Sequence, residues 1–336
     1  MKKPTVAMTM GDPAGIGPEI SVQAAVNSKV TDRVNTLIIG DATRLQKAID
    51  ILAEKGKMTV KPEIRPINTI QEARFEQGVI EVIDLHNVPN DLPWGELSAI
   101  AGQCAFDYLN KAVQLAVQKE IDAICTAPLN KEAWKLAGVK YPGHTEALAE
   151  LSGAPGSAMM LVNAGLRVVH VTTHVSLKKA IEMATKERVL GRIRLTAQSL
   201  SQFGVPNPKI AVAGLNPHAG EGGLFGDEEA QELIPAIEQA RAEGYQVTGP
   251  LPPDSVFSRA ASGEFDVVIA MYHDQGHIAI KMLGFDTGIN VTLGLPILRT
   301  SVDHGTAFDI AGKGIARDQS MIAAMMVAAD FLQGRQ

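Results

Sequence analysis

The chain has 336 residues, of which 46% are hydrophobic and 20% are charged, and its net charge at pH 7 is -6. Such a composition is typical of a soluble globular protein of one or two domains, and a weakly acidic chain is a poor partner for nucleic acid. No segment approaches the about 20 consecutive apolar residues that a membrane helix needs. Only two cysteines, Cys104 and Cys125, are present, which predicts a reduced protein of the cytoplasm without a disulfide framework.

In the first half of the chain, short apolar runs alternate with segments of helical periodicity. Pro4 to Met10 is predicted to be a buried strand, and a helix is expected to begin near Pro18, which suits a first helical position. The turn between them, GDPAGIGPE, is not GxGxxG, so the Rossmann fingerprint does not apply. Further strands are expected over residues 34–40, 58–68, 78–85 and 121–126, and Asp41 and Ser98 are expected to cap helices.

In the second half, each of three apolar runs is closely followed by a histidine. Strand alternating with helix predicts an α/β fold with a mainly parallel sheet. His174, His218 and His273 come just after the runs 166–172, 209–213 and 266–271. Ligand sites in open α/β sheets lie beyond the carboxyl ends of strands, so the three histidines could converge. Three imidazoles suit zinc and other transition ions and leave a position open for substrate; structural histidines are the alternative.

Residues 271–316 concentrate polar side chains between apolar, strand-like runs. This stretch holds three of the eight histidines, His273, His277 and His304, and it also holds Lys281, Asn290, Arg299 and Asp303. Polar groups in such a setting must be paired if they are buried. Surface loops with scattered polar residues are the alternative, and the apolar neighbours of Lys281 (IAIKML) and Arg299 (LPILRT) weaken it.

Four motifs carry a resemblance to a known family. YHDQG, Lys281 and GINVTLGLPILRTSVDHGTA together resemble the signature of the 4-hydroxythreonine-4-phosphate dehydrogenases of vitamin B6 synthesis. GDPAGIGPE (Gly11–Glu19), GHTEAL (Gly143–Leu148) and GLNPHAGEGG (Gly214–Gly223) match the same family in the same order. His277 in HDQGHI is similar to the branch that acts on D-threonate or D-erythronate 4-phosphate. GIGPE and HGTAFDIAGKGIA also resemble motifs of the isocitrate and isopropylmalate dehydrogenases.

The resemblance implies an architecture. We expect an α/β, two-domain isocitrate/isopropylmalate dehydrogenase-like fold with mainly parallel sheets and the active site in the interdomain cleft. Residues 1–125 plus 280–336 would form a terminal domain, and residues 126–279 a central one. The family also implies a homodimer whose active sites are shared between the subunits.

The resemblance further implies roles for single residues. His174, His218 and His273 fall on the family's metal positions, and its substrate-binding positions fall on His144, Thr145, Lys281, Asn290 and Arg299. Lysine and arginine can neutralise a phosphate and a carboxylate. On the chain's own pattern, Thr145 could instead cap a helix.

The cofactor and the acid–base groups come from the same resemblance. His304, Gly305 and Asp309 in HGTAFDIAGKGIA would hold the adenosine end of the dinucleotide, and Asp309 would favour NAD over NADP because a carboxylate repels a 2′-phosphate. A turn before the last helix is the alternative. Asp274 and Asp254 are candidates to relay the hydroxyl proton. The alternative role for Asp274 is to orient His273.

The predicted function is therefore an oxidative decarboxylation that needs NAD and a divalent ion (Zn, Mg, Mn or Co). The substrate would be a four-carbon 3-hydroxy acid 4-phosphate, and His277 favours 4-phospho-D-threonate or D-erythronate, which would yield dihydroxyacetone phosphate and carbon dioxide in carbohydrate metabolism. The alternatives are 4-phosphooxy-L-threonine dehydrogenase of pyridoxine and pyridoxal phosphate biosynthesis, and a non-catalytic binder of phosphorylated metabolites. A dehydrogenase for unphosphorylated acids is ranked last, since it predicts an acidic metal site.

Overall fold

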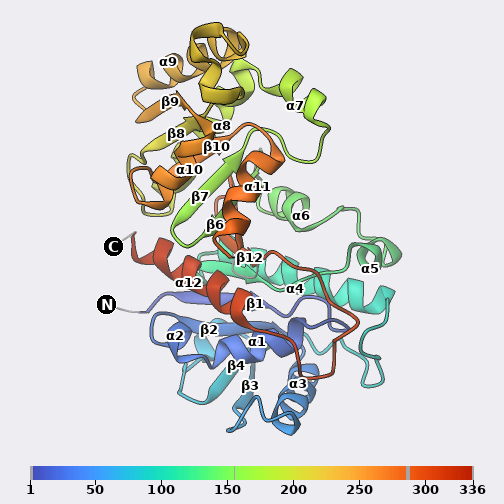
Figure 1. Ribbon diagram of the computed structural model, residues 1–336. Helices are drawn as coiled ribbons and strands as arrows, with labels where there is room; N and C mark the ends of the chain where they lie inside the picture. The colour runs from blue at the N-terminus through green and yellow to red at the C-terminus, as the bar shows by residue number, and fades with distance from the viewer. Residues whose placement is uncertain (1–2, 155, 285–287, 335–336) are drawn as a thin grey trace. The chain divides into compact units, whose positions relative to one another are not determined.

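The computed structural model describes residues 3–154, 156–284 and 288–334. The chain folds into two compact units (Figure 1). We call Met1–Gly156 with Leu295–Leu332 the terminal unit, and Ser157–Gly294 the central unit. Each unit contains a β-sheet with helices packed against it.

The terminal unit has an entirely parallel sheet in the order β3-β4-β2-β1-β5-β12. Its strands are β1 (Thr5–Thr9), β2 (Asn35–Gly40), β3 (Glu63–Ile67), β4 (Val79–Asp84), β5 (Ala123–Thr126) and β12 (Leu298–Val302). Every residue of β1, β5 and β12 is buried. Strands covered on both faces read as continuous apolar runs, which is why the sequence shows them so clearly.

Helices of the terminal unit connect and cover these strands. They are α1 (Gly17–Ala25), α2 (Ser28–Thr31), α3 (Ala42–Glu54), α4 (Ala99–Val117), α5 (Lys131–Leu136), α6 (His144–Leu151) and α12 (Gln319–Gln333), with a 3₁₀ turn η1 (Ile70–Glu72). The two predicted caps are confirmed: Asp41 accepts the Arg44 N–H at 2.8 Å, and Ser98 accepts the Ala101 N–H at 3.4 Å. α4 packs against β1, β2 and β5.

The central unit has a mixed sheet in the order β11-β6-β7-β10-β8-β9. Its strands are β6 (Ala158–Asn163), β7 (Leu166–His170), β8 (Ile210–Ala213), β9 (Val247–Leu251), β10 (Val267–Ala270) and β11 (Ile289–Leu293). β6 pairs antiparallel with both β11 and β7, whereas β7, β10, β8 and β9 run parallel. The β6–β7 turn has positive φ at Ala164 (46°) and Gly165 (87°), as a two-residue hairpin turn requires.

The helical elements of the central unit are α7 (Leu177–Met183), α8 (Lys186–Gln202), η2 (Pro217–Gly223), η3 (Glu229–Leu233), α9 (Ile234–Ala242), α10 (Pro253–Ala261) and α11 (His273–Met282). The helical segment over residues 229–242 begins with a π-helical turn, η3, and continues as α9. α10 packs against β7, β8 and β10, and α11 packs against β6, β7 and β10.

The expected α/β class with mainly parallel sheets is confirmed. The expected domain boundaries differ from those of the two compact units. Residues 126–156 group with the terminal unit, because α5 and α6 pack on α4. Residues 280–294 group with the central unit, because β11 pairs with β6 along its whole length.

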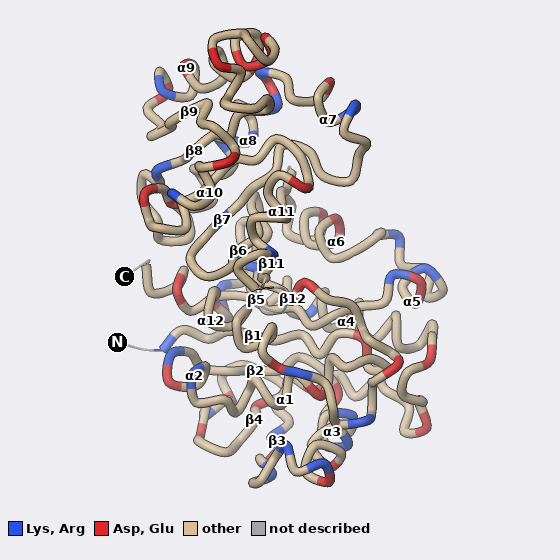
Figure 2. Tube along the Cα trace, viewed as in Figure 1, with Lys and Arg blue, Asp and Glu red and all other residues tan. Residues whose placement is uncertain are grey.

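Charged residues of both signs are interspersed along the helices and loops of each unit (Figure 2). Within the described part of the chain, no helix combines the length and the apolar character that crossing a membrane demands.

Candidate functional site

The three predicted metal-binding histidines follow neighbouring strands of the central sheet. β7, β10 and β8 are adjacent and parallel, so their carboxyl ends lie at the same edge. His174 follows β7, His273 begins the helix after β10, and His218 follows β8. The ring centroids of His174 and His273 are 5.6 Å apart. The fold thus places the three histidine-bearing segments after adjacent strands and brings two of the rings into contact, but the ligand atoms of all three histidines do not lie within 4.8 Å of one another.

His218 lies in a loop with an unusual backbone. Residues His218 to Gly222 all have positive φ, between 42° and 79°. Such angles are costly for residues other than glycine and persist only where the surroundings enforce them. The carboxylate of Glu229, which is 4% exposed, accepts the backbone N–H groups of Leu215 at 2.8 Å and Asn216 at 2.7 Å. The loop is therefore tied down on its inner side while His218 itself is exposed.

His273 is oriented by a carboxylate. Its Nδ1 lies 2.7 Å from Oδ1 of Asp274. When Nδ1–H donates to a carboxylate, the lone pair of the neutral imidazole is on Nε2, which is the tautomer that binds a metal ion. Of the two roles considered for Asp274, the geometry favours orienting His273. Asp254 is exposed in the first turn of α10.

Two further histidines lie behind His273. The ring of His277 stacks on that of His273, with centroids 3.7 Å apart and planes at 11°, and its Nδ1 is 3.0 Å from the His273 carbonyl oxygen. His170 is 4.7 Å from His277 between ring centroids and only 3% exposed. Burial, together with the charges of His277 and His273, lowers the pKa of His170 to about 3. Gly276 makes room, since a Cβ there would lie 2.3 Å from His170 Nε2.

Sequence reasoning missed this stack. The spacing of His273 and His277, four positions apart on a helix, is a signal that could have indicated it. His170 lies within the buried strand run VVHV, where nothing in the pattern distinguishes it from a structural histidine.

The predicted substrate residues divide between the units. His144 and Thr145 are the first two residues of α6, and Arg299 lies in β12, all in the terminal unit. The N-cap of α6 is Gly143, so Thr145 does not cap this helix. Burial, followed by the charges of Arg299 and Lys131, holds the pKa of His144 well below its usual range, so its imidazole is neutral. The ring of His144 contacts Trp134 edge to face at 5.8 Å.

Arg299 is a buried cation. It is 3% exposed, and it donates to Oγ1 of Thr126 from Nε at 3.2 Å and from Nη2 at 2.6 Å. Burial lowers its pKa to about 10, which leaves the guanidinium charged at neutral pH. A buried cation attracts an anionic ligand strongly, because little water screens it.

Lys281 and Asn290 belong to the central unit. Lys281 lies in the last turn of α11 and is exposed, as are its neighbours Met282 (81%) and Leu283 (43%). The argument that apolar neighbours imply burial is therefore wrong for Lys281 and right for Arg299. Asn290 is half-buried in β11, and its Oδ1 has no hydrogen-bond partner among the described residues.

The predicted dinucleotide-binding segment, residues 304–316, follows β12. His304 is anchored by its ring nitrogens, with Nε2 at 2.7 Å from Ser320 Oγ and Nδ1 at 3.0 Å from the Gly305 carbonyl. Asp309 is exposed. The segment also forms the turn before α12, so the turn that the alternative expected is present.

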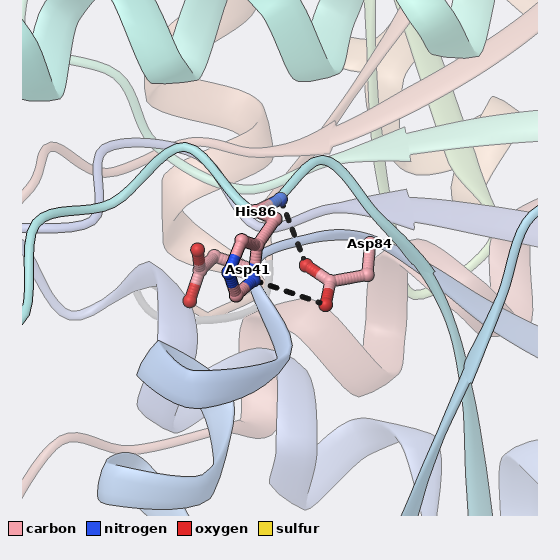
Figure 3. Close-up of side chains that lie close together, drawn as sticks. All are labelled: Asp41, Asp84 and His86. Carbon is pink, nitrogen blue, oxygen red and sulfur yellow. Dashed lines mark hydrogen bonds and ion pairs between the residues drawn. The ribbon is translucent and has the colours of Figure 1, made fainter.

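A different group of titratable side chains lies where β2 and β4 end (Figure 3). Asp41, Asp84 and His86 each offer a possible metal-ligating atom, and these atoms lie within 4.8 Å of one another. However, Asp41 accepts the N–H groups of Arg44 and Val88, and Asp84 accepts the N–H of His86. Their carboxylates fix the turns that follow the two strands, which explains the cluster without a metal ion.

Known proteins are similar to this chain over almost its whole length. The family model "Pyridoxal phosphate biosynthetic protein PdxA" matches residues 32–328. The D-threonate 4-phosphate dehydrogenase of Cupriavidus necator is 50% identical over 334 residues, which cover 99% of this chain and 98% of that protein. A crystal structure of a 4-hydroxythreonine-4-phosphate dehydrogenase from Burkholderia phymatum has a TM-score of 0.91 at 49% identity, covering 98% of this chain and 99% of that one. The corresponding enzyme from Klebsiella pneumoniae gives 0.90 at 45% identity, covering 99% of each chain.

Proposed function

We propose, from the premise that this chain belongs to the pyridoxal phosphate biosynthetic protein PdxA family, that it oxidises a phosphorylated four-carbon hydroxy acid with NAD and a divalent metal ion. The names of its relatives support a dehydrogenase of phosphorylated hydroxy acids. The observation that carries the metal-dependent part is that three histidine-bearing segments follow adjacent strands at one edge of the central sheet, where the ring centroids of His174 and His273 are 5.6 Å apart.

The donor set fits a divalent ion. His273 has its Nδ1 engaged by Asp274, which leaves Nε2 to bind, and His174 and His218 are exposed. An ion held by these three imidazoles would supply Lewis acidity, lowering the pKa of a substrate hydroxyl and stabilising the negative charge that develops as carbon dioxide leaves. Zinc, magnesium, manganese and cobalt are the candidates, and imidazole ligands favour zinc or cobalt among them.

The remaining residues would bind and orient the substrate. Arg299 can hold an anionic group with two parallel N–H donors, and Lys281 can neutralise a second one. His144, Thr145 and Asn290 would contribute neutral donors. Asp254 is our candidate to receive the hydroxyl proton, while Asp274 keeps His273 in its binding tautomer. His304, Gly305 and Asp309 would contact the adenosine end of NAD.

We favour 4-phospho-D-threonate or D-erythronate as substrate, with dihydroxyacetone phosphate and carbon dioxide as products. The 50% identity to a protein named D-threonate 4-phosphate dehydrogenase supports this choice, as does His277. The alternative is 4-phosphooxy-L-threonine, because the similar solved structures carry the name 4-hydroxythreonine-4-phosphate dehydrogenase.

Steady-state kinetics on both purified substrates, with NAD and each metal in turn, tests the proposal. We expect NADH to form and the specificity constant for phosphothreonate to be the larger. A larger constant for the phosphorylated hydroxythreonine would assign the chain to the vitamin B6 reaction. Absence of NADH with either substrate would favour a non-catalytic binding protein, and a preference for unphosphorylated malate-type acids would revive the third alternative.

The family resemblance also leads us to propose a homodimer with shared active sites. If each site takes residues from both subunits, His144→Ala and Lys281→Ala should each be inactive. Mixing the two variants should then restore part of the activity, because one intact site forms in each heterodimer. No recovery after verified subunit exchange would place both residues in the same subunit's site.

A further inference from the structure

The motif Gly11–Glu19 has no role in the proposed chemistry, yet it ends in a fully buried acid. Glu19 lies in the first turn of α1 and is 0% exposed. Its Oε2 accepts the backbone N–H of Gly312 at 3.0 Å, and its Oε1 accepts that of Gly314 at 2.7 Å. Both glycines belong to the segment after β12 that we propose to bind the dinucleotide. One carboxylate therefore ties the start of the chain to this segment.

The two glycines give the segment a shape that a carboxylate can hold. Gly312 and Gly314 have φ of 72° and 68°, in the left-handed region that side chains rarely adopt. A Cβ on Gly312 would lie 2.5 Å from Cγ of Trp94, and a Cβ on Gly314 would lie 2.7 Å from Cγ of Lys55. Backbone N–H groups that converge in this way form a concavity suited to an anion, and Glu19 supplies that anion from within the protein.

Trp94, which packs against Gly312, is itself held in place by Arg44. The guanidinium of Arg44 lies 3.4 Å from the centroid of the Trp94 ring. Arg44 donates from Nε to the Pro13 carbonyl at 2.7 Å and from Nη1 to the Leu92 carbonyl at 2.9 Å. Trp94 is thus held against Gly312 by a cation that the same N-terminal motif anchors.

The motif also contacts the other end of the segment. The N–H of Ile16 donates to the Thr306 carbonyl at 3.0 Å, and a Cβ on Gly15 would lie 2.9 Å from both the Cβ and the carbonyl oxygen of Thr306. Contacts at Thr306 and at Gly312 and Gly314 bracket the residues between them. Those residues include Asp309, which is exposed and which we propose to contact the ribose.

We propose that Glu19 is a positioning residue for NAD: by holding Gly312 and Gly314 it fixes the conformation in which residues 304–314 meet the dinucleotide. This inference rests on the proposed function, because it requires that this segment bind NAD. Glu19 itself touches no ligand, since it is fully buried. Burial raises the pKa of Glu19, and the two glycine N–H groups act against that rise, so the carboxylate is kept at this place against a desolvation penalty.

The test is Glu19→Gln in the full-length protein, with NAD affinity measured by titration calorimetry. In the variant, an amide N–H₂ faces one of the two glycine N–H donors, so one charge-assisted hydrogen bond is lost. We expect the Kd for NAD to rise at least about tenfold. We also expect KM for NAD to rise with kcat little changed, while the Kd for the metal ion and the KM for the phosphorylated substrate stay as in the wild type.

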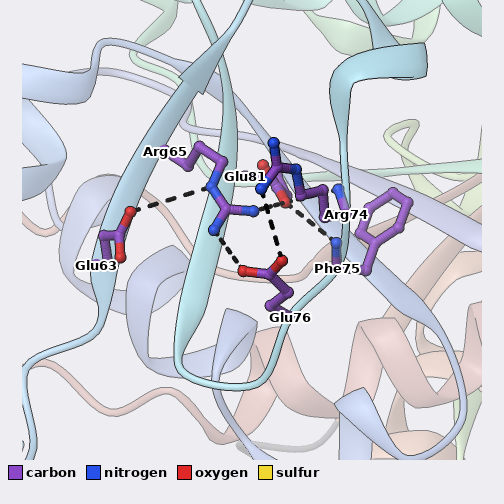
Figure 4. A network of polar contacts seen from close by, with 6 residues as sticks. All are labelled: Glu63, Arg65, Arg74, Phe75, Glu76 and Glu81. Carbon is purple, nitrogen blue, oxygen red and sulfur yellow. Dashed lines mark hydrogen bonds and ion pairs between the residues drawn. The ribbon is translucent and has the colours of Figure 1, made fainter.

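Glu81→Gln is the matched control (Figure 4). Glu81 is also a buried carboxylate of the terminal unit, 1% exposed, and its Oε1 accepts the N–H groups of Arg74 at 2.9 Å and Phe75 at 3.1 Å. These contacts lie on the side of β3 and β4, at the edge of the sheet opposite β12. The control should lower Tm and leave the Kd for NAD unchanged.

The outcomes separate the two proposals. If Glu19→Gln lowers Tm like the control and its Kd for NAD equals the wild-type value, Glu19 only stabilises the fold and the inference is overturned. If the wild type itself binds no NAD, the cofactor assignment is wrong, and the role proposed for Glu19 is then wrong as well. Should Glu19→Gln not fold, Glu19→Asp replaces it: this variant keeps the charge but draws it back from the glycines, and the same rise in Kd is expected.

Discussion

The loop after β8 in the central unit and the segment after β12 in the terminal unit are built alike. Each has left-handed backbone, carries proposed ligand-binding residues and is tied by a buried glutamate that accepts two backbone N–H groups. They differ in where the glutamate comes from. Glu229 is 13 and 14 residues from its partners, whereas Glu19 is 293 and 295 residues from its own.

Because of this difference, the proposed metal loop and the proposed dinucleotide segment should respond to different substitutions. A tie between residues close in sequence needs little loop closure, whereas a tie across most of the chain forms only when the sheet has assembled. The His218 loop is therefore largely a local structure of the central unit, and the dinucleotide segment depends on the whole terminal unit. Changes at the contacts between residues 11–19 and the segment after β12 should weaken NAD binding, and changes at the loop after β8 should weaken metal binding.

The largest effect is expected for His218→Ala. Losing one of three imidazole ligands should weaken metal binding by more than about a hundredfold, beyond the range measured for partners that only orient a ligand. The fold should survive, because His218 is exposed and such substitutions change stability little. Metal analysis of the purified variant and its Tm provide the measurements. Full metal content in a folded variant would remove His218 from the site.

Glu229→Gln should produce a smaller loss of the same kind. Both N–H groups of Leu215 and Asn216 donate to Oε1, and the side-chain N–H of Asn216 donates to Oε2. In the variant an amide N–H₂ replaces one oxygen and the negative charge is lost, so the hydrogen bond from the Asn216 side chain is lost, the two backbone bonds weaken, and the backbone that carries His218 loosens. We expect the Kd for the metal ion to rise about ten- to hundredfold. NAD affinity should not change, in contrast to Glu19→Gln. If the two variants weakened both ligands equally, the two loops would not be independent.

Arg299→Lys probes a group that belongs to neither loop. Lysine offers a point charge instead of a planar pair of donors, so one charge-assisted hydrogen bond to the substrate anion is lost. We expect kcat/KM for the phosphorylated substrate to fall about tenfold, or up to a hundredfold. The Kd for NAD should stay unchanged in calorimetry. An unchanged kcat/KM, or a loss confined to NAD, would refute the assignment of Arg299.

The smallest effect is expected for Asp12, and it is a change in how stability depends on pH. Burial raises the pKa of Asp12 to about 6, although the N–H of Ala14 and the charge of Arg44 act against the rise. A carboxyl group whose pKa is higher in the folded than in the unfolded state adds stability at low pH and loses that contribution as pH rises through the folded value.

The wild type should therefore gain about 1 kcal/mol of unfolding free energy relative to Asp12→Asn between about pH 7 and pH 5. The asparagine can still accept the Ala14 N–H that Asp12 accepts at 2.8 Å, so the variant is a close structural match. Urea unfolding of both proteins at the two pH values measures the difference. Parallel pH dependences would show that Asp12 is already charged throughout this range.

The sequence predicted those features that depend on neighbours along the chain. Buried strands appear as apolar runs, and His174, His218 and His273 could be grouped because each closely follows such a run. The Asp41 and Ser98 caps are also local. Apolar neighbours misled at Lys281, because Met282 and Leu283 at the end of α11 are exposed in this chain.

Contacts between residues far apart in the chain could not be predicted from the sequence pattern. Nothing in GDPAGIGPE indicates that Glu19 meets Gly312 and Gly314, because the pairing depends on β12 lying beside β5. The same holds for His170, which meets His277 only after β7 and α11 pack together. The domain boundaries differed for a related reason: whether residues 126–156 join one unit or the other is decided by the packing of α5 and α6 on α4.

The place of β12 in the terminal sheet has a consequence for synthesis on the ribosome. β12 pairs with β5 from Leu298 opposite Ala123 to Ser301 opposite Thr126, so the two strands emerge far apart in time. Until β12 has been synthesised, the apolar strand β5 has an edge without its final partner strand. Such an open edge is a site where nascent chains aggregate or recruit chaperones. The central sheet, by contrast, has all its strands once Leu293 has emerged. The central unit can therefore fold while the terminal one waits, and the segment held by Glu19 is among the last parts of the protein to take its final form.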